Sequence, residues 1–215
     1  MSPPLVIAVD GPAASGKGTI ASGLAALYGL PHLDTGLLYR AVGVAVLAAG
    51  GRLDDEAGAA KIAASLDLAR LDRPEFRTRE AGEAASQVAV HPAVRLALLK
   101  MQQDFARRPG GAVIDGRDIG TVIAPDAVAK LFVTATPEVR AERRWKQLTG
   151  QGESVSMAEV LEDIRLRDAR DSGRGAAPLT QADDAVLLDT SQESIESAAD
   201  AARRIVEAAR IRSNG

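Results

Sequence analysis

Residues 11–19 read GPAASGKGT, and they follow directly on the continuous apolar run Leu5–Val9. Such a run, rich in β-branched side chains, is typical of a strand buried on both faces of a parallel sheet. The segment Ile20–Tyr28 that comes next has a helical pattern, so the glycine-rich stretch joins a strand to a helix. Its glycines let consecutive N–H groups face an anion, and Lys17 adds a positive charge for the outer phosphates. The sequence therefore predicts a loop that binds the phosphates of a nucleoside triphosphate.

One position departs from the general phosphate-loop pattern, which has Ser or Thr directly after the lysine. Gly18 stands there, with Thr19 after it. This order resembles the loop of nucleoside monophosphate kinases and leaves open whether a loop hydroxyl coordinates Mg²⁺. The alternative interpretation is a glycine turn that binds nothing. We expect ATP to contact the whole loop, which comprises Gly11, Pro12, Ala13, Ala14, Ser15, Gly16, Lys17, Gly18 and Thr19.

Three further apolar runs predict strands, each followed by a polar turn: Ala112–Ile114, Ala129–Thr134 and Ala185–Leu188. Thr136 and Pro137 are typical of a helix start, which predicts a helix through Leu148. A capping box predicts the start of the last helix, whose apolar face we expect to pack on the sheet. Strands that alternate with helices favour a right-handed, mostly parallel α/β sheet. The capping box is formed by Thr190 and Glu193, and the apolar face by Ile195, Ala199, Ala202, Ile205 and Ala209.

Two segments do not have the pattern of a sheet. Residues 35–108 are mostly helical in pattern, which indicates an insertion. Residues 150–178 begin with a glycine loop, restart as a helix at Ser156 with Glu159 as a capping box, and end in further glycines, which suits a lid. We expect a single domain over residues 1–215, with its core at about 1–34, 109–149 and 179–215.

Composition limits the classes of protein. The chain has 46% hydrophobic and 26% charged residues, which is globular, and it has no Cys, which excludes disulfides and thiolate metal sites. No apolar stretch is long enough for a membrane span and no signal peptide is recognisable, so we expect a cytoplasmic protein without membrane contact. The net charge of −3 argues against nucleic-acid binding. We expect a monomer.

Basic residues indicate where a second, anionic substrate binds. Arg40 follows Asp34 and Thr35 on one short segment, and it could hold a phosphate or be an ordinary surface arginine. In the expected lid, Arg167, Arg170, Asp171 and Arg174 share one helical face. Three guanidinium groups on one face repel one another unless an anion lies among them, and the alternative is a solvated face of salt bridges.

The stretch DGRDIGTVI begins at the end of the predicted strand Ala112–Ile114. Open α/β sheets place their ligand crevice at the carboxyl ends of the strands. There Asp115 could hold Mg²⁺ through water, and Arg117 could reach the transferred phosphoryl group. The alternative is an Asp–Arg pair that closes a turn.

Five motifs, in order and spacing, resemble those of bacterial cytidylate kinases: DGPAASGKGT, DTGLLYR, ASQVA with the downstream Arg95, DGRDIGTV and RLRDARDSGRGAAPL. Together they cover nearly the whole chain. The resemblance implies a three-layer phosphate-loop kinase fold with a five-stranded parallel sheet, an insertion that binds the nucleoside monophosphate, and a short lid over ATP.

The resemblance also implies roles for individual residues. Arg40, Arg117 and Arg174 match positions that hold the acceptor phosphate, and Thr35 matches a hydroxyl near it. Arg167 and Asp171 match positions near the sugar. The catalytic group would comprise Lys17, Asp115, Arg117, Arg170 and Arg174, and the cytosine contacts would be Ser86, Arg95 and Asp118.

The chemistry of cytosine fits these contacts, because a carboxylate accepts from its amino group and Arg95 can donate to its ring carbonyl and nitrogen. Uracil presents the opposite pattern, so we expect discrimination against UMP. The chain departs from many bacterial members between Leu71 and Arg77, where it is too short for a strand-rich excursion. This puts in doubt how that part of the insertion closes.

The expected reaction is transfer of the γ-phosphoryl group of ATP to CMP or dCMP, with Mg²⁺ and without a general base, since the attacking phosphate oxygen is already anionic. Arg140, Arg143 or Arg144, on the helix after Ala129–Thr134, could contact ATP, and the sequence does not distinguish among them. We interpret His32, His91 and Trp145 as structural. The rival interpretations are a kinase for another small acceptor and a nucleotide-dependent switch that hydrolyses ATP without an acceptor.

Overall fold

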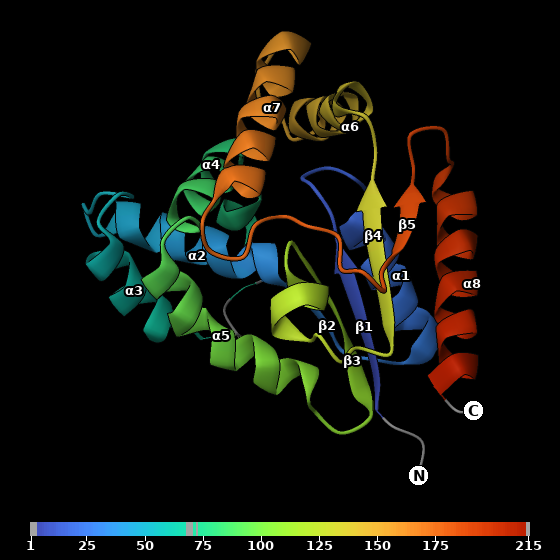
Figure 1. Cartoon of the computed structure of the whole chain (residues 1–215). Helices are drawn as coiled ribbons and strands as arrows, with labels where there is room; N and C mark the ends of the chain where they lie inside the picture. The colour runs from blue at the N-terminus through green and yellow to red at the C-terminus, as the bar shows by residue number, and fades with distance from the viewer. Residues whose placement is uncertain (1–3, 68–70, 72, 214–215) are drawn as a thin grey trace.

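The structure, a computed structural model, describes residues 4–67, 71 and 73–213. Five parallel strands form one sheet in the order β2-β3-β1-β4-β5 (Figure 1). The glycine-rich stretch therefore leaves the central strand of the sheet. The strand bounds are β1 Leu5–Asp10, β2 His32–Asp34, β3 Gly111–Gly116, β4 Ala129–Thr134 and β5 Val186–Asp189.

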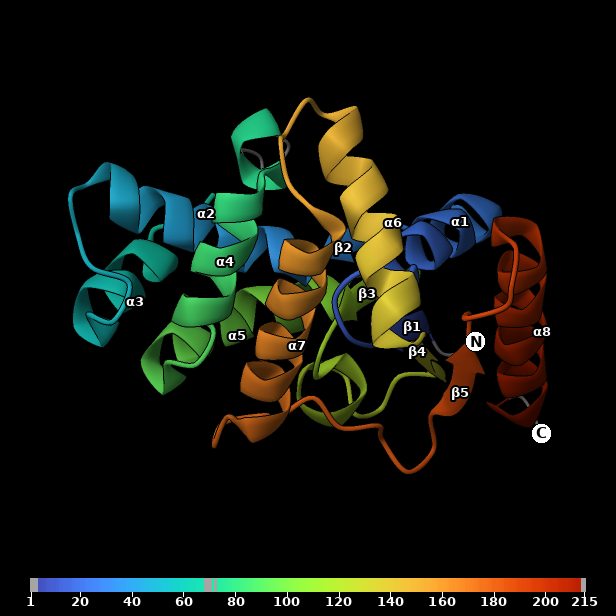
Figure 2. The ribbon, with the colours of Figure 1, turned by 90° about the horizontal axis from the view of Figure 1, so that it is seen from above.

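The helices cover both faces of the sheet and its carboxyl end. Helices α1 and α8 lie on one face, α2 to α5 extend to the other side, and α6 and α7 lie above the carboxyl ends of the strands (Figures 1 and 2). The bounds are α1 Lys17–Tyr28, α2 Thr35–Ala48, α3 Glu56–Ala64, η2 Pro74–Arg77, α4 Arg79–Val88, α5 Pro92–Ala106, η3 Ile119–Ile123, α6 Pro137–Gly150, α7 Met157–Gly173 and α8 Ile195–Ser213.

Alternating side chains of the central strands supply two hydrophobic cores. Ala8 of β1 and Ile114 of β3 belong to the core beneath α2 and α5. Ile7 and Val9, which point to the opposite face, pack with the side chains of α1 and α8. A smaller cluster joins α6 to α7. The sheet is thus buried on both faces, as the unbroken apolar run in β1 predicts.

The expected five-stranded parallel α/β fold is confirmed. Strand β2 was not predicted, because a strand of three residues with only Leu33 buried has no recognisable hydrophobic pattern. The predicted start of the helix at Thr136 is confirmed, and its hydroxyl accepts from Val139 N. The capping box at Ser156 is confirmed as well.

The predicted capping box at the last helix is wrong. Helix α8 begins at Ile195, and the Ser194 hydroxyl accepts from Ser197 N at 3.1 Å. Ile195 is 74% exposed and Ala199 is also exposed, so the buried face is rotated from the expected one. It consists of Ala198, Ala202, Val206 and Ala209.

The two expected insertions correspond to helical segments of the chain. Residues 35–108 contain α2 to α5, and residues 150–178 contain α7. The short segment Leu71–Arg77 includes a single 3₁₀ turn, while residue 72 lies outside the described residues. The boundaries of core, insertion and lid stay predictions. Nowhere in the described chain does a helix combine the length and apolarity needed to cross a membrane.

Candidate active site

The glycine-rich stretch forms a loop that opens onto the N-terminus of α1. Gly16 adopts φ 91° and ends the loop, so that Lys17 is the first helical residue. Gly11 passes so close to β4 that a Cβ there would lie 2.0 Å from the Val133 carbonyl oxygen. These positions require glycine for steric reasons. The loop therefore presents backbone N–H groups and a helix N-terminus, which together suit an anion.

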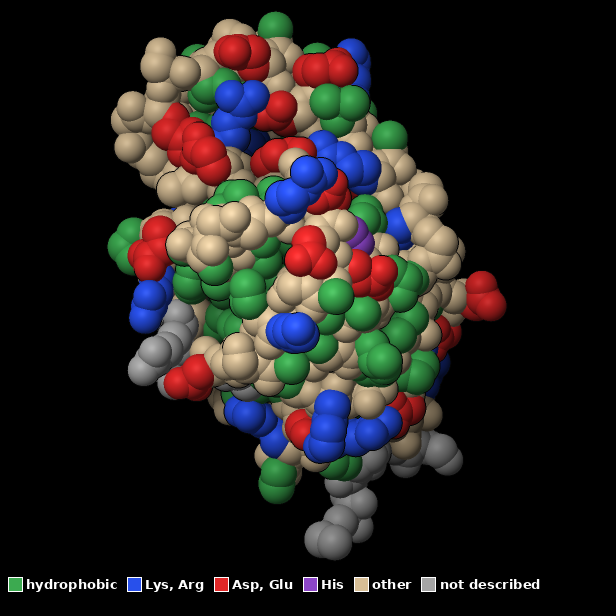
Figure 3. All heavy atoms as spheres, turned by 90° about the vertical axis from the view of Figure 1, so that its left-hand side faces the viewer, with side chains coloured by type: hydrophobic (Ala, Val, Ile, Leu, Met, Phe, Trp, Pro, Cys, Tyr) green, Lys and Arg blue, Asp and Glu red, His purple; other side chains and the backbone are tan. Residues whose placement is uncertain are grey.

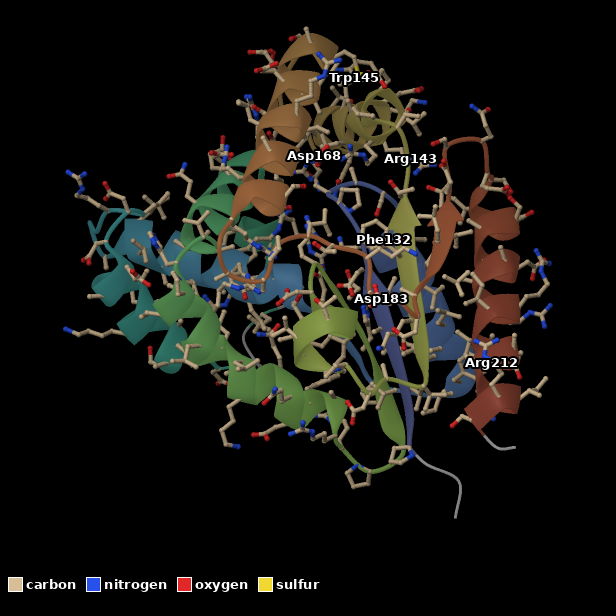
Figure 4. All side chains as sticks on the ribbon, in the orientation of Figure 1. Phe132, Arg143, Trp145, Asp168, Asp183 and Arg212 are labelled. Carbon is tan, nitrogen blue, oxygen red and sulfur yellow. The ribbon has the colours of Figure 1, made fainter. Side chains whose placement is uncertain are left out.

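Side chains from two other elements hold this loop from behind. The Thr190 hydroxyl donates to the Ser15 carbonyl oxygen at 2.9 Å, and Arg143 Nη1 donates to the same oxygen at 3.3 Å. Arg140 Nη1 donates to the Ala13 carbonyl oxygen at 3.3 Å. Figure 4 shows Arg143 above the carboxyl end of β4. Thr190, which was expected to cap a helix, instead anchors the phosphate loop.

Two carboxylates lie at the ends of neighbouring strands beside Lys17. Asp115 Oδ2 is 3.7 Å from Lys17 Nζ. Asp34 of β2 lies opposite Asp115 of β3 in the register of the two strands. Burial and the neighbouring Asp115 raise the pKa of Asp34, while burial and Arg117 lower the pKa of Lys17. The site thus holds charges of both signs in a partly dehydrated space, which strengthens their interaction with a phosphate or a cation.

His32 belongs to this site, which the sequence did not indicate. Its Nε2 atom lies 2.8 Å from Asp115 Oδ1. Thr35 Oγ1 donates to the Asp115 carbonyl oxygen at 2.8 Å. Asp115 Oδ2 is buried and has no hydrogen-bond partner among the described residues. The contact with His32 fixes the carboxylate that faces Lys17, so His32 holds a residue of the candidate site, and its interpretation as structural stays a prediction. The missing signal was β2, which brings His32 beside β3.

The other two residues that we interpreted as structural make local contacts. His91 Nε2 lies 2.8 Å from the Leu53 carbonyl oxygen, and Trp145 Nε1 donates to the Val155 carbonyl oxygen at 3.0 Å. Both contacts join elements within the helical parts of the chain.

A cleft of about 510 Å³ opens from the phosphate loop toward α2, α4 and α7. Figure 3, which views the side formed by the insertion, shows basic and acidic side chains intermixed in the upper part of the molecule. Arg40 Nη1, at one wall of the cleft, donates to the carbonyl oxygens of Phe76 and Thr78. The cationic residues that line the cleft are Lys17, Arg40, Arg79, Arg117, Arg144 and Arg167.

These cations are close enough to disfavour one another. Burial and the charge of Arg144 lower the pKa of Arg40 to about 10. Burial and the charge of Arg117 lower the pKa of Arg167 to about 9. Such mutual repulsion is relieved when an anion binds among the groups. The crowding favours a phosphate site over a solvated face of salt bridges.

The predicted cytosine contacts come from three elements: Ser86 from α4, Arg95 from α5, and Asp118 from the turn after β3. Arg95 Nη2 donates to Asp118 Oδ2 at 2.5 Å, and the Arg95 guanidinium lies 5.7 Å from the centre of the Tyr39 ring. Arg174 Nη2 is 3.9 Å from Asp118 Oδ1. Ser86 is buried on α4, and its hydroxyl has no hydrogen-bond partner among the described residues.

The arginines predicted for the lid divide into two groups. Arg167 and Arg174 approach Asp171, which accepts from Arg117 Nε at 2.8 Å. Arg170 instead points to α4, where its Nη2 lies 2.8 Å from Glu83 Oε1. The structure thus groups Arg167 and Arg174 around Asp171, which binds Arg117, and places Arg170 against the insertion.

The three arginines of α6 take different positions. Arg140 is buried, and its guanidinium makes two hydrogen bonds to the Asp168 carboxylate of α7. Arg144 donates to the Thr78 carbonyl oxygen, on the side of the insertion. Arg143 lies against the phosphate loop, where its Nη1 atom donates to the Ser15 carbonyl oxygen.

Comparison with known proteins agrees with this geometry. The model of the cytidylate kinase family matches residues 7–208. Cytidylate kinase of Caulobacter vibrioides is 71% identical over 207 residues, which cover 96% of this chain and 97% of that protein. Cytidylate kinase of Xanthobacter autotrophicus is 66% identical over 206 residues, covering 96% and 99%.

Solved structures show likeness in fold. An uncharacterised protein from Eubacterium ventriosum has a TM-score of 0.55 at 15% identity, covering 94% of this chain and 98% of its own. A protein from Thermus thermophilus has a TM-score of 0.50 at 24% identity, covering 95% and 97%. Family match and identity over nearly the full length lead to one conclusion: this chain belongs to the cytidylate kinase family, whose members are phosphotransferases.

Proposed function

We propose that this protein transfers the γ-phosphoryl group of ATP to the phosphate of CMP or dCMP, giving ADP and CDP or dCDP. The observation that carries the proposal is the cleft whose cations continue from Lys17 of the phosphate loop to Arg40 and Arg167. Membership of the cytidylate kinase family supports the same reaction. A phosphate acceptor needs this continuous positive lining, whereas a hydrolase would need only a positioned water.

ATP would bind with its phosphates on the loop Gly11–Thr19, where Lys17 neutralises the charge that develops on the outer phosphates. Arg40, Arg117 and Arg174 would hold the acceptor phosphate, and Arg167 and Asp171 would lie near the sugar. The attacking oxygen is anionic, so these groups align and neutralise but need not remove a proton. Closure of α7 over the cleft would exclude the water that competes as an acceptor.

The residues beside Lys17 suit Mg²⁺ bound mainly by ATP and water. Asp115 offers a buried oxygen that has no hydrogen-bond partner in the described part of the chain, and Asp34 lies next to it. Within the described residues there is no group of three or more His, Cys, Asp or Glu that could enclose a metal ion, which suits an ion that keeps several waters. When bound, the ion would neutralise charge on the outer phosphates of ATP.

Asp118, Arg95 and Ser86 would select the pyrimidine. Asp118 can accept from the cytosine amino group, and Arg95 can donate to the ring carbonyl and nitrogen. Uracil would place an acceptor against the Asp118 carboxylate and leave it unpaired, at a cost of roughly 1 to 3 kcal/mol. We therefore propose that CMP and dCMP are preferred to UMP. A monomeric state and a cytoplasmic location stay predictions.

The test is ADP release by the purified protein, measured by a coupled assay with CMP, dCMP, UMP or AMP as acceptor. We expect release to depend on the acceptor and to be fastest with CMP or dCMP. Release that is independent of any acceptor would favour a nucleotide-dependent switch, and preference for UMP or AMP would favour another kinase.

The variant Arg40→Ala locates the acceptor site in the same assay. This substitution removes one cation from the cleft and should reduce turnover at least about a hundredfold, because charge-assisted hydrogen bonds to phosphate are among the strongest. ATP binding, measured by calorimetry, should be retained, since Arg40 contacts no residue of the loop in the described structure. Unchanged turnover would show that the acceptor phosphate lies elsewhere.

A further inference from the structure

Asp10 is the last residue of β1, directly before the phosphate loop, and its carboxylate points away from that loop. Asp10 Oδ1 accepts from Ile119 N and Oδ2 accepts from Gly120 N, both at 2.8 Å. The side chain is buried, with 5% of the residue exposed. These two amides begin η3, so the carboxylate ties the central strand to that single turn.

The turn held by Asp10 also carries Asp118, the residue proposed to meet the cytosine amino group. Val122 N and Ile123 N donate to the Asp118 carbonyl oxygen at 2.9 and 3.2 Å, which makes Asp118 the N-terminal end of η3. A single helical turn is too short to be stable alone. Its first amides need an outside acceptor, and Asp10 supplies both acceptor atoms.

Burial of the Asp10 carboxylate costs free energy in its ionised form, which indicates a specific role. Burial raises its pKa to about 6, against the lowering effect of the two amides. The charged groups around it are Asp118, which raises the pKa further, and Arg117, which lowers it. From β4, the Lys130 stem packs near Gly120, while its ammonium group binds Asp184 and the Pro125 carbonyl oxygen. No described cation forms a direct ion pair with Asp10 in the salt bridges of the structure.

We propose that Asp10 is a positioning residue for selection of the base: it fixes the turn that aims Asp118 at the pyrimidine, and it does so without touching either nucleotide. The inference rests on the proposed function. It assigns to the residue before the phosphate loop a task in the acceptor site rather than in ATP binding.

The test is Asp10→Asn, which keeps the shape but turns one acceptor atom into a donor that faces an amide N–H. At about pH 7.5 we expect the KM for CMP to rise about tenfold, and the ratio of kcat/KM for CMP to that for UMP to fall by a similar factor. The Kd for ATP without CMP should stay within about twofold, because both hydrogen bonds described for the Asp10 carboxylate go to η3 and not to the loop.

The pH dependence gives a readout that loss of stability would not. The phosphate of CMP has a pKa near 6, so the KM for CMP changes with pH in both proteins. The quantity to follow is therefore the KM of the variant divided by the KM of the wild type, in which the titration of CMP cancels. When Asp10 of the wild type is protonated, its O–H group faces one of the two amides, as the NH₂ group of Asn does in the variant. The ratio should therefore fall toward one as the pH is lowered from about 7.5 to about 5.5.

Two further variants keep the test independent of folding. Val206→Ala removes a buried methyl pair on α8, far from the turn, and should lower the melting temperature without changing the KM for CMP. Gly120→Ala would place a Cβ 3.4 Å from Asp10 Oδ2 and 3.1 Å from Lys130 Cδ. It should raise the KM for CMP in the same direction as Asp10→Asn, with no change in the polar groups.

Three outcomes would overturn the inference. They are an unchanged KM for CMP in Asp10→Asn, an equal loss of ATP affinity, and a KM ratio that does not depend on pH. If the unaltered protein releases ADP only with acceptors other than a pyrimidine monophosphate, the proposed function itself fails, and the assay on wild type reveals this before any variant is compared.

Discussion

His32 Nε2 lies 2.8 Å from Asp115 Oδ1, and this contact leaves the other carboxylate oxygen directed at Lys17 Nζ, 3.7 Å away. The two residues come from neighbouring parallel strands, β2 and β3. A carboxylate with one oxygen held by a ring nitrogen cannot rotate freely. His32 thus sets the direction in which Asp115 presents its unpaired oxygen to the phosphate end of the cleft.

Removal of this contact should weaken catalysis more than binding of CMP. In His32→Leu, Asp115 loses its fixed orientation, so we expect kcat to fall about tenfold, the effect of a lost hydrogen bond to a charged group. His32→Gln can restore a donor near the position of Nε2 and should recover most of the rate. Steady-state kinetics with both substrates measure the effect.

Calorimetry separates this positioning role from general damage. The Kd for ATP should weaken in His32→Leu when Mg²⁺ is present and change little when it is absent, because Asp115 is the group proposed to lie near the metal. Equal rates for His32→Leu and the wild type, or no recovery in His32→Gln, would contradict this account of His32.

A second prediction concerns the buried ion pair between α6 and α7. Arg140 and Asp168 make two hydrogen bonds, and the Arg140 side chain is only 4% exposed (Figure 4 shows Asp168 on α7 above the sheet). Asp168→Asn should lower the free energy of unfolding by about 3 kcal/mol, because it leaves a buried guanidinium without its counterion. Denaturant unfolding monitored by Trp145 fluorescence measures this.

The same two helices provide a matched control. Arg165 of α7 and Glu138 of α6 form a pair at 3.3 Å that is 56% and 60% exposed. Glu138→Gln should change the free energy of unfolding by less than about 1 kcal/mol, as exposed pairs do. Equal effects of the two substitutions would contradict the view that burial makes the Arg140–Asp168 pair more important for stability than the exposed pair.

The raised pKa of Asp10 predicts how stability depends on pH. The folded protein holds the proton up to about pH 6, whereas the unfolded chain releases it near 3.8. This contribution to stability is therefore complete below the unfolded value and is lost as the pH rises through about 6. The loss amounts to about 3 kcal/mol for a shift of this size.

Asp10→Asn cannot ionise and should not show this loss. The difference in unfolding free energy between variant and wild type should move by about 2 kcal/mol in favour of the variant between about pH 4 and pH 7. Denaturant titrations of both proteins at the two pH values measure it. A constant difference would mean that the pKa of Asp10 is not raised in the folded state.

Local features of the sequence predicted most of the fold. The apolar runs of β1, β3, β4 and β5 and the loop glycines act within a few residues, so one sequence suffices to find them. The start of α8 was misplaced because Thr190 and Glu193 have the spacing of a capping box. In the structure Thr190 instead reaches the Ser15 carbonyl oxygen, a partner far away in the chain.

Contacts between residues far apart in the chain also explain why two residues of the site could not be identified from the sequence. His32 and Asp10 act through contacts with residues 83 and more than 100 positions away. Their spacing in the chain carries no sign of these partners, and only the order of the strands brings them together. Arg95 and Asp118, by contrast, were grouped by resemblance to a family, and the structure joins them directly.

Two arginines of α6, Arg143 and Arg144, contact different parts of the candidate site. Arg143 Nη1 donates to the Ser15 carbonyl oxygen, and its Nη2 donates to the Thr190 carbonyl oxygen at 2.7 Å, so it borders the phosphate loop. Arg144 lies at the Thr78 carbonyl oxygen, on the acceptor side of the cleft. Arg143→Ala should raise the KM for ATP about tenfold and leave the KM for CMP within about twofold. Arg144→Ala should do the reverse, since it removes a cation near Arg40 from the cleft. Steady-state kinetics with each substrate varied in turn distinguish the two, and parallel effects of both variants on both substrates would contradict this division of the helix.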